Sequence, residues 1–257
     1  MNEVRTYPNA PIVEAILEIR CAPSSGVPVG ALEALLSSEA PRYPVTEHLE
    51  DFRSELRGSV APGSRTPVTA TAERLITGVA GVSQCRQRVF QARENGFTFA
   101  HMRPYPGWAA FRGEAQRLWA LYRGIAGAAR ITRVAIRTIN RICLDGPPSD
   151  PARYLRTLPV VAPQAGTSVH GFFMQVAVDQ PSICSVALIT ESIDRSADSG
   201  RIAVILDIDL FRERELPHSE LDLWALLDRM RQTKDDVFEA CITEEARKDF
   251  RECQSSS

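Results

Sequence analysis

Charged residues recur in two segments that lie far apart in the chain and have the alternating pattern of β-strands. Residues 12–21 place Glu14 and Glu18 on one side of an expected strand and apolar residues on the other, because side chains alternate between the two faces of a strand. Residues 129–146 repeat the pattern with arginine. Their charged positions are Arg133, Arg137 and Arg141. If the two strands pair side by side and antiparallel, the acids and arginines become cross-strand neighbours.

Such an Arg–Glu ladder has two interpretations. It can hold the register of the two strands, although exposed ion pairs contribute only about 0–1 kcal/mol each. It can also form a polar platform on an open sheet face, where arginines with spare donors bind a carboxylate or phosphate of a ligand or partner. The candidate binding residues are Glu14, Glu18, Arg133, Arg137, Asn140 and Arg141. No catalytic residue, metal or cofactor is expected.

Other residues that could do chemistry are weaker candidates. Asp207 and Asp209 share one face of an expected strand and could bind a divalent cation, but no third acid or histidine is assigned to them, so a surface role is favoured. His101 and His170 lie in strand patterns, where a lone histidine is usually structural. The chain has no G-x-S-x-G, H-E-x-x-H or P-loop motif.

Four aromatic residues cluster around an expected hairpin and the start of a helix. They are Phe97, Phe99, Tyr105 and Trp108. Core packing is the favoured interpretation of this cluster. The alternative is an aromatic platform on which a base or a peptide stacks.

The composition is that of a globular protein. The chain has 257 residues, of which 44% are apolar and 24% charged, so a core can form without disulfides or a metal. The formal net charge of −2 opposes nucleic-acid binding, although all but two of the 30 basic residues are arginine. The six cysteines form no C-x-x-C pair, the first residues lack an apolar signal core, and no apolar run reaches the ~20 residues of a membrane span. We therefore expect a reduced cytoplasmic protein with free, mostly buried thiols.

Hydrophobic periodicity predicts a similar order of elements in the two halves of the chain. The first half is expected to have helices within 27–44 and 106–126 and strands over 12–21, 50–60, 73–84 and 86–102, the last a hairpin with a type I′ turn at Asn95-Gly96. The second half is expected to have strands over 129–146, 167–179, 183–192 and 201–211. Its expected helices are a short one over 149–158 capped by Ser149 or Asp150, a long one over 219–241 capped by Ser219, and a final one over 244–250 capped by Thr243.

Each half is therefore predicted as strand, helix, three or four antiparallel strands and long helix. We expect an α+β fold in which an internally duplicated β-α-β(3-4)-α unit, 1–127 and 128–257, forms one compact pseudo-twofold domain. This is the arrangement of the TATA-binding-protein-like fold. In that fold one curved antiparallel sheet carries helices on one face, and the first strands of the two halves meet in the middle. The similarity concerns architecture, which does not imply function.

Several stretches of the chain resemble one bacterial family. They are "YPNAPIVEAILEIR", "YPGWAAFRGEAQRLW", "ITRVAIRTINRICL", "DIDLF" and "DVFEACITEEARKDF". In this order they resemble a sporadically distributed family of similar length, whose most specific parts are the Pro-x-x-Glu first strand and the Arg-x-x-Asn-Arg-Ile mid-chain strand. Thr138 departs from the aromatic residue expected there. The family has no established activity and implies no catalytic residues, while its patchy distribution suggests an accessory role in conflict, defence or a specialised gene cluster.

The leading functional hypothesis is a non-enzymatic binding or interaction protein that uses the concave sheet face. Its expected partner is a protein or a small anionic ligand, and a homo-oligomer is possible. One alternative is an enzyme or sensor for a small anionic metabolite, with Arg137 and Arg141 holding the anion and a glutamate acting as base. A second is nucleic-acid binding on the saddle-shaped face, which the acids on that face and the net charge oppose.

Overall fold

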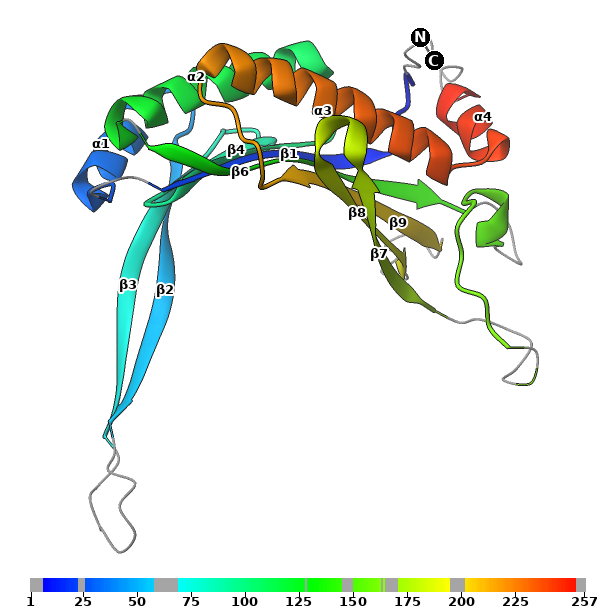
Figure 1. Ribbon diagram of the computed structural model, residues 1–257, viewed down its shortest axis with the longest axis horizontal. Coiled ribbons are helices and arrows are strands. Elements are labelled where there is room, and N and C mark those ends of the chain that lie inside the picture. The colour runs from blue at the N-terminus through cyan, green and yellow to red at the C-terminus, as the bar shows by residue number, and fades with distance from the viewer. Residues whose placement is uncertain are drawn as a thin grey trace, which may run out of the picture.

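A single nine-stranded antiparallel sheet, covered by helices on one side, forms the protein (Figure 1). The computed structural model describes residues 7–22, 26–57, 69–127, 129–144, 150–162, 164, 171–194 and 202–252, with the backbone alone for 52–57, 69–74 and 251–252. The strand order is β2-β3-β4-β5-β1-β6-β9-β8-β7. The predicted α+β class and single antiparallel sheet are therefore confirmed.

The strands and helices alternate along the chain in the following order. The first part comprises β1 (Ile12–Ala22), α1 (Val29–Glu39), β2 (Val45–Arg57), β3 (Thr69–Val82), β4 (Arg88–Arg93), β5 (Gly96–Met102) and α2 (Trp108–Ala126). The second comprises β6 (Arg130–Cys143), the 3-10 turn η1 (Pro151–Arg153), β7 (Phe173–Gln180), the 3-10 turn η3 (Pro181–Ile183), β8 (Ser185–Asp194), β9 (Ala203–Arg212), α3 (Glu220–Cys241) and α4 (Glu244–Glu252).

The strands β1 and β6 lie next to each other in the middle of the sheet. They are antiparallel, and Ile16 is in register with Arg137 and Glu18 with Ala135. The predicted pairing of the two charged strands is thus confirmed. The sheet is arched, and Figure 1 shows α1, α2 and α3 on its convex side, so that none of the described α-helices lies on the concave side.

The core lies between the convex side of the sheet and the helices. The odd positions of β1 and the even positions of β6 point into it, as the period-two pattern predicts. Helix α2 contributes the buried stripe Phe111, Ala115, Leu118, Trp119 and Tyr122. Burying such side chains contributes roughly 1.5–3 kcal/mol each, so the helices are held on this side by their apolar faces. The opposite side chains of β1 and β6 are consequently left on the concave face.

The hairpin formed by β4 and β5 is confirmed, but its turn is one residue earlier than predicted. The turn residues are Glu94 and Asn95, and neither has the positive φ of a type I′ turn. Gly96 is the first residue of β5, opposite Arg20 of β1. A Cβ atom there would lie 2.9 Å from the carbonyl oxygen of Ile19, so the glycine permits the close approach of β5 to β1.

The short helix predicted over 149–158 is wrong. Ser149, one of its two predicted caps, lies outside the described residues. Over 150–158 the structure has only the 3-10 turn η1, capped by the Asp150 carboxylate, which accepts from the Ala152 amide. The chain then leaves the helical path because Leu155 makes an isolated β-bridge to Ile242. The predicted caps of the last two helices are confirmed, since Ser219 accepts from the Asp222 amide and Thr243 from the Ala246 amide.

The described cysteines are all free thiols, as predicted, but most of them are not buried. Cys21 and Cys241 lie in the core, whereas Cys85, Cys143 and Cys184 are exposed. Cys253 lies outside the described residues. Among the helices that the structure describes, none is both long and apolar enough to cross a membrane.

Candidate functional site

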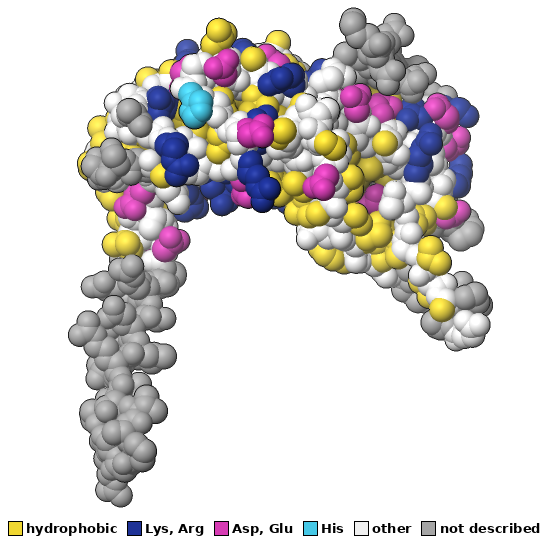
Figure 2. Space-filling view, viewed as in Figure 1, with side chains coloured by type: hydrophobic (Ala, Val, Ile, Leu, Met, Phe, Trp, Pro, Cys, Tyr) yellow, Lys and Arg dark blue, Asp and Glu magenta, His cyan; other side chains and the backbone are white. Residues whose placement is uncertain are grey.

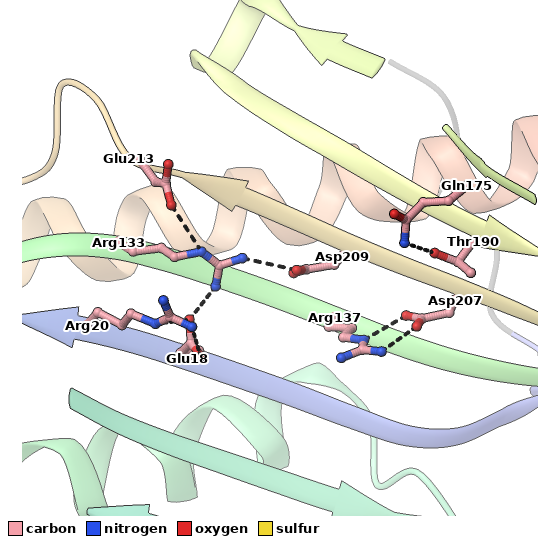
Figure 3. A network of polar contacts seen from close by, with 9 residues as sticks. All are labelled: Glu18, Arg20, Arg133, Arg137, Gln175, Thr190, Asp207, Asp209 and Glu213. Carbon is pink, nitrogen blue, oxygen red and sulfur yellow. Dashed lines mark hydrogen bonds and ion pairs between the residues drawn. The ribbon is translucent and has the colours of Figure 1, made fainter. Parts of the chain in front are cut away.

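Arg133 is the centre of a charged network on the concave face, which Figure 3 shows from close by. Its guanidinium donates to the Glu18 carboxylate on β1 and, at 3.0 Å, to Asp209 on β9. Glu213 lies 3.5 Å away, and the Phe211 ring lies under the guanidinium with its centroid at 4.7 Å. With only 13% of its side chain exposed, Arg133 joins β1, β6 and β9.

Arg137 forms the second centre of the network, four residues after Arg133 in β6. Its Nε and Nη2 donate to the two carboxylate oxygens of Asp207 at 2.8 and 2.5 Å, which is the two-point geometry of a strong charge-assisted pair. The Arg137 side chain is 42% exposed, and its Nη1 makes no hydrogen bond to any described residue. Arg137 is thus held in place while keeping a donor that faces solvent.

Glu14 lies beside this pair on the same face. Glu14 and Asp207 are both in register with Ile139, one from each neighbouring strand. Burial raises the pKa of the Glu14 carboxyl, the charge of Arg137 opposes that rise, and Asp207 adds to it. Arg137 therefore has one acid bound and a second nearby.

Arg141 is paired toward the outer strands of the second half. Its Nε donates to Asp194 on β8 at 2.9 Å, and its Nη1 lies 3.3 Å from the Cys143 sulfur. Arg20 of β1 pairs with Glu18 of its own strand at 3.0 Å. The predicted ladder of arginines and β1 glutamates is therefore correct only for Arg133 and Glu18. Arg137 and Arg141 pair instead with aspartates of β9 and β8.

Asn140 does not lie on the concave face, so the prediction that it is one of the binding residues of that face is wrong. It is buried on the helix side of β6, where its amide donates to the Leu206 carbonyl at 3.0 Å. The period-two alternation already placed Asn140 opposite Arg137 and Arg141, so the sequence contained the information that excludes it from that face.

Asp207 and Asp209 are central to the site, and sequence reasoning gave them too small a role. Burial raises the pKa of Asp209, while Arg133 lowers it, and the Asp209 Oδ1 is buried without a hydrogen-bond partner among the described residues. The described part of the chain holds no group of three His, Cys, Asp or Glu side chains placed to bind a metal ion. The i, i+2 spacing of Asp207 and Asp209 was the signal that both carboxylates lie on one face. It suggested a bound cation, whereas the two carboxylates bind arginines.

The remaining sequence candidates lie away from the concave face. His101 is buried on the helix side, its Nδ1 lies 2.6 Å from the Met102 carbonyl, and burial lowers its pKa. His170 lies outside the described residues. Phe97 and Phe99 are core residues, as the favoured interpretation predicted, and Tyr105 and Trp108 are partly buried against the same core. Tyr105 and Trp108 also line a cavity on the convex side.

Comparison with known proteins gives no relative for this chain: no family model matches it, and no curated protein is significantly similar to it. The resemblance to a sporadically distributed bacterial family stays a prediction.

Proposed function

We propose that the protein is a non-enzymatic binding protein that holds a partner protein against the concave face of its sheet. The observation that carries this proposal is Arg137, which is fixed by Asp207 and still directs a free guanidinium donor to solvent from the middle of a helix-free face. An arginine held in one orientation loses little conformational freedom when a partner carboxylate binds it.

The surroundings of Arg137 fit a protein surface better than a small ligand. Figure 2 shows acidic and basic side chains next to each other along the underside of the arch. At the far end of this face, Phe173 of β7 is 71% exposed, so a large aromatic side chain lies on the same sheet face as the arginines. Arginine and aromatic side chains are enriched among the residues that dominate protein–protein binding energies.

An enzyme site is less well supported, because Glu14, Glu18, Arg133 and Arg137 do not line the cavity that the described residues form on the convex side of the sheet. A catalytic glutamate needs an enclosure that excludes water, and Glu14 lies on an open sheet face. Binding of nucleic acid is also disfavoured, since each of the three central arginines already lies next to an aspartate.

We also propose that the two halves, 1–127 and 128–257, are copies of one β-α-β(3-4)-α unit in a TATA-binding-protein-like architecture. The strand order supports this, because each half runs outward from the centre as first strand, last strand and then the preceding strands. The unit is less complete in the second half, which has η1 where the first half has α1. Such an arch would place β1 and β6 at the middle of a binding face.

We also propose a cytoplasmic location, because the described cysteines are free thiols.

The test is affinity purification from native cells with the wild-type chain and with Arg137→Glu, followed by mass spectrometry of the intact complexes. The reversed charge repels a partner carboxylate and should abolish a stoichiometric complex. A matched control is Arg229→Glu, because Arg229 is an exposed residue of α3 on the opposite side of the sheet. This control should keep the complex.

Circular dichroism and thermal melting of each variant separate loss of binding from loss of fold. If Arg137→Glu unfolds the protein, the charged network is structural. A folded Arg137→Glu protein that retains its partner would refute the concave face as the binding surface.

A further inference from the structure

A cavity of about 1190 Å³ lies on the convex side, opposite the charged face. The segments around it are 7–13, 103–108, the helix side of β6, α3 and α4. This volume is slightly above the roughly 300–1,000 Å³ of ordinary small-molecule sites. The proposed interaction on the concave face makes no use of this cavity.

The floor of the cavity carries polar groups in an otherwise apolar strand face. Ile136 and Ile142 of β6 line it together with Thr138 and Asn140, all pointing toward the helices. Asn140 is committed to backbone carbonyls, to which its amide donates. The Thr138 hydroxyl instead lies 3.4 Å from the Nζ of Lys234 on α3.

Lys234 is a nearly buried cation at this cavity. Its residue is 6% exposed, and it is one of only two lysines in the chain. The Lys234 ammonium donates to the Thr138 hydroxyl and forms an ion pair with Asp235, whose carboxylate lies 2.7 Å away. An ammonium carries three donors, and Lys234 makes no other hydrogen bond to a described residue. A buried lysine donor is costly to leave unpaired, so this position favours an acceptor from a ligand.

The local charge suits a monoanion. Asp235 is shared by Lys234 and by Arg231, whose Nε lies 2.8 Å from it, so two cations face one carboxylate. One negative charge would balance this cluster, whereas a phosphate dianion would leave it with an excess negative charge. Tyr105, whose pKa is raised by burial and then by Asp235, adds a neutral hydroxyl that bonds to no described residue.

Another part of the cavity wall, at the start of α2 and on α3, is suited to an apolar body. Trp108 and Phe111 line it at the start of α2, with ring centroids 6.1 Å apart, and Phe238 lines it from α3. Aromatic walls of this kind bind flat or aliphatic groups by burying their apolar area.

We propose that this cavity binds the carboxylate of a small organic acid with an aromatic or aliphatic body. The Lys234 ammonium and the Tyr105 hydroxyl donate to the carboxylate, Thr138 and Asp235 position the ammonium, and the apolar body lies against Trp108 and Phe111. One strand, β6, would then present a protein-binding surface on one face and a small-molecule site on the other.

The experiment titrates the full chain with benzoate, phenylacetate and hexanoate by calorimetry and thermal shift, at constant ionic strength. The matched neutral amides of the three acids are the ligand controls. At least one acid should bind saturably and raise the melting temperature. Its amide should bind at least about tenfold more weakly, because a hydrogen bond between charged groups is lost.

Lys234→Met keeps the length of the side chain and removes its charge, so it should weaken binding of the acid about tenfold or more. The matched control is Lys248→Met, because Lys248 is the other lysine and is 63% exposed on α4. This variant should bind as the wild type does. If Lys234→Met fails to fold, Tyr105→Phe and Thr138→Val decide instead, and each should weaken binding several-fold.

Three results would overturn the proposal. In the first, none of the three acids binds at millimolar concentration. In the second, an acid and its amide bind equally well, which would mean that the negative charge of the ligand does not contribute to binding. In the third, the folded Lys234, Tyr105 and Thr138 variants bind the acid as tightly as the wild type.

Discussion

Arg137 binds Asp207 diagonally rather than the aspartate opposite to it in the sheet. The residue in register with Arg137 on β9 is Asp209, yet the Arg137 guanidinium reaches two residues along the strand to Asp207. Asp209 is thereby left for Arg133, which also reaches diagonally. This shift places Asp209 between two arginines and lets Arg133 and Arg137 hold different positions of β9.

The two central arginines should differ in their contribution to stability, and this is our first prediction. Arg133 lies between carboxylates with 13% of its side chain exposed, so Arg133→Gln leaves Asp209 partly buried and unpaired. We expect the free energy of unfolding to fall by about 2 kcal/mol, less than the full value of a buried pair because Asp209 retains some solvent contact. Urea unfolding at neutral pH measures the change.

Arg137→Gln is the matched control for this comparison. Arg137 is 42% exposed and is bonded to one carboxylate rather than two, although that carboxylate, Asp207, is itself 13% exposed. We therefore expect a loss of about 1 kcal/mol, smaller than the loss for Arg133→Gln. If both variants lose the same free energy of unfolding, the difference in burial between Arg133 and Arg137 does not distinguish a structural arginine from one that is available to a partner.

A second prediction concerns the contact between β5 and β1. In Gly96→Ala the new methyl group would lie 2.9 Å from the Ile19 carbonyl oxygen and 3.1 Å from the Arg20 Cα, and neither backbone atom can move without displacing the central strand. We expect a loss of about 1–3 kcal/mol in the free energy of unfolding.

Gly113→Ala is the opposite case and the control. Gly113 lies inside α2, and a Cβ there meets no atom within 4 Å. Alanine is the better helix former, so this variant should stabilise the protein by about 0.5–1 kcal/mol. Urea unfolding measures both variants, and a Gly96→Ala protein as stable as the wild type would contradict the close approach of the strands.

Strand periodicity made the centre of the fold predictable. Glu18 and Arg133 could be assigned to one face from the order of residues alone, because the side-chain period of two fixes the face once a strand is recognised. The partners of Arg137 and Arg141 could not be predicted from the sequence. They depend on which distant strand pairs with β6 on the side away from β1, and the order of residues does not show that this strand is β9. Asp207 and Asp194 therefore remained unassigned, although their alternation within β9 and β8 was visible.

The cavity could not be foreseen for a similar reason. Lys234 falls among the stripe residues of a long amphipathic helix, but nothing in the spacing shows that Thr138, 96 residues earlier, lies beneath it. The short helix predicted over 149–158 does not form because Tyr154, Leu155 and Arg156 make their backbone contacts with the residues at the end of α3 rather than with the next turn. Local patterns fix faces and caps, whereas contacts between distant segments decide sites and short helices.

The third prediction is a pH-dependent stability that arises from one buried acid. Glu191 on the helix side of β8 is 0% exposed, and neither of its carboxylate oxygens has a hydrogen-bond partner among the described residues. Burial raises the pKa of its carboxyl from 4.5 to about 7. The folded protein therefore binds a proton that the unfolded chain has already released between these two pH values.

Because the folded state binds more protons than the unfolded state in that interval, the free energy of unfolding falls as pH rises from about 4.5 to about 7, and then levels off. A difference of this size corresponds to at most about 3 kcal/mol. Glu191→Gln keeps the shape of the side chain and cannot ionise, so it should be more stable than the wild type at pH values above 7 by up to this amount.

Urea unfolding of both proteins across this pH range measures the difference directly. The difference between the two free energies of unfolding should be small at the acid end, grow through the interval and stay constant above it. Since other titrating groups are the same in both proteins, the subtraction isolates Glu191. A difference that does not change with pH would mean that the Glu191 carboxyl finds a partner or solvent in the folded protein and ionises there as it does in the unfolded chain.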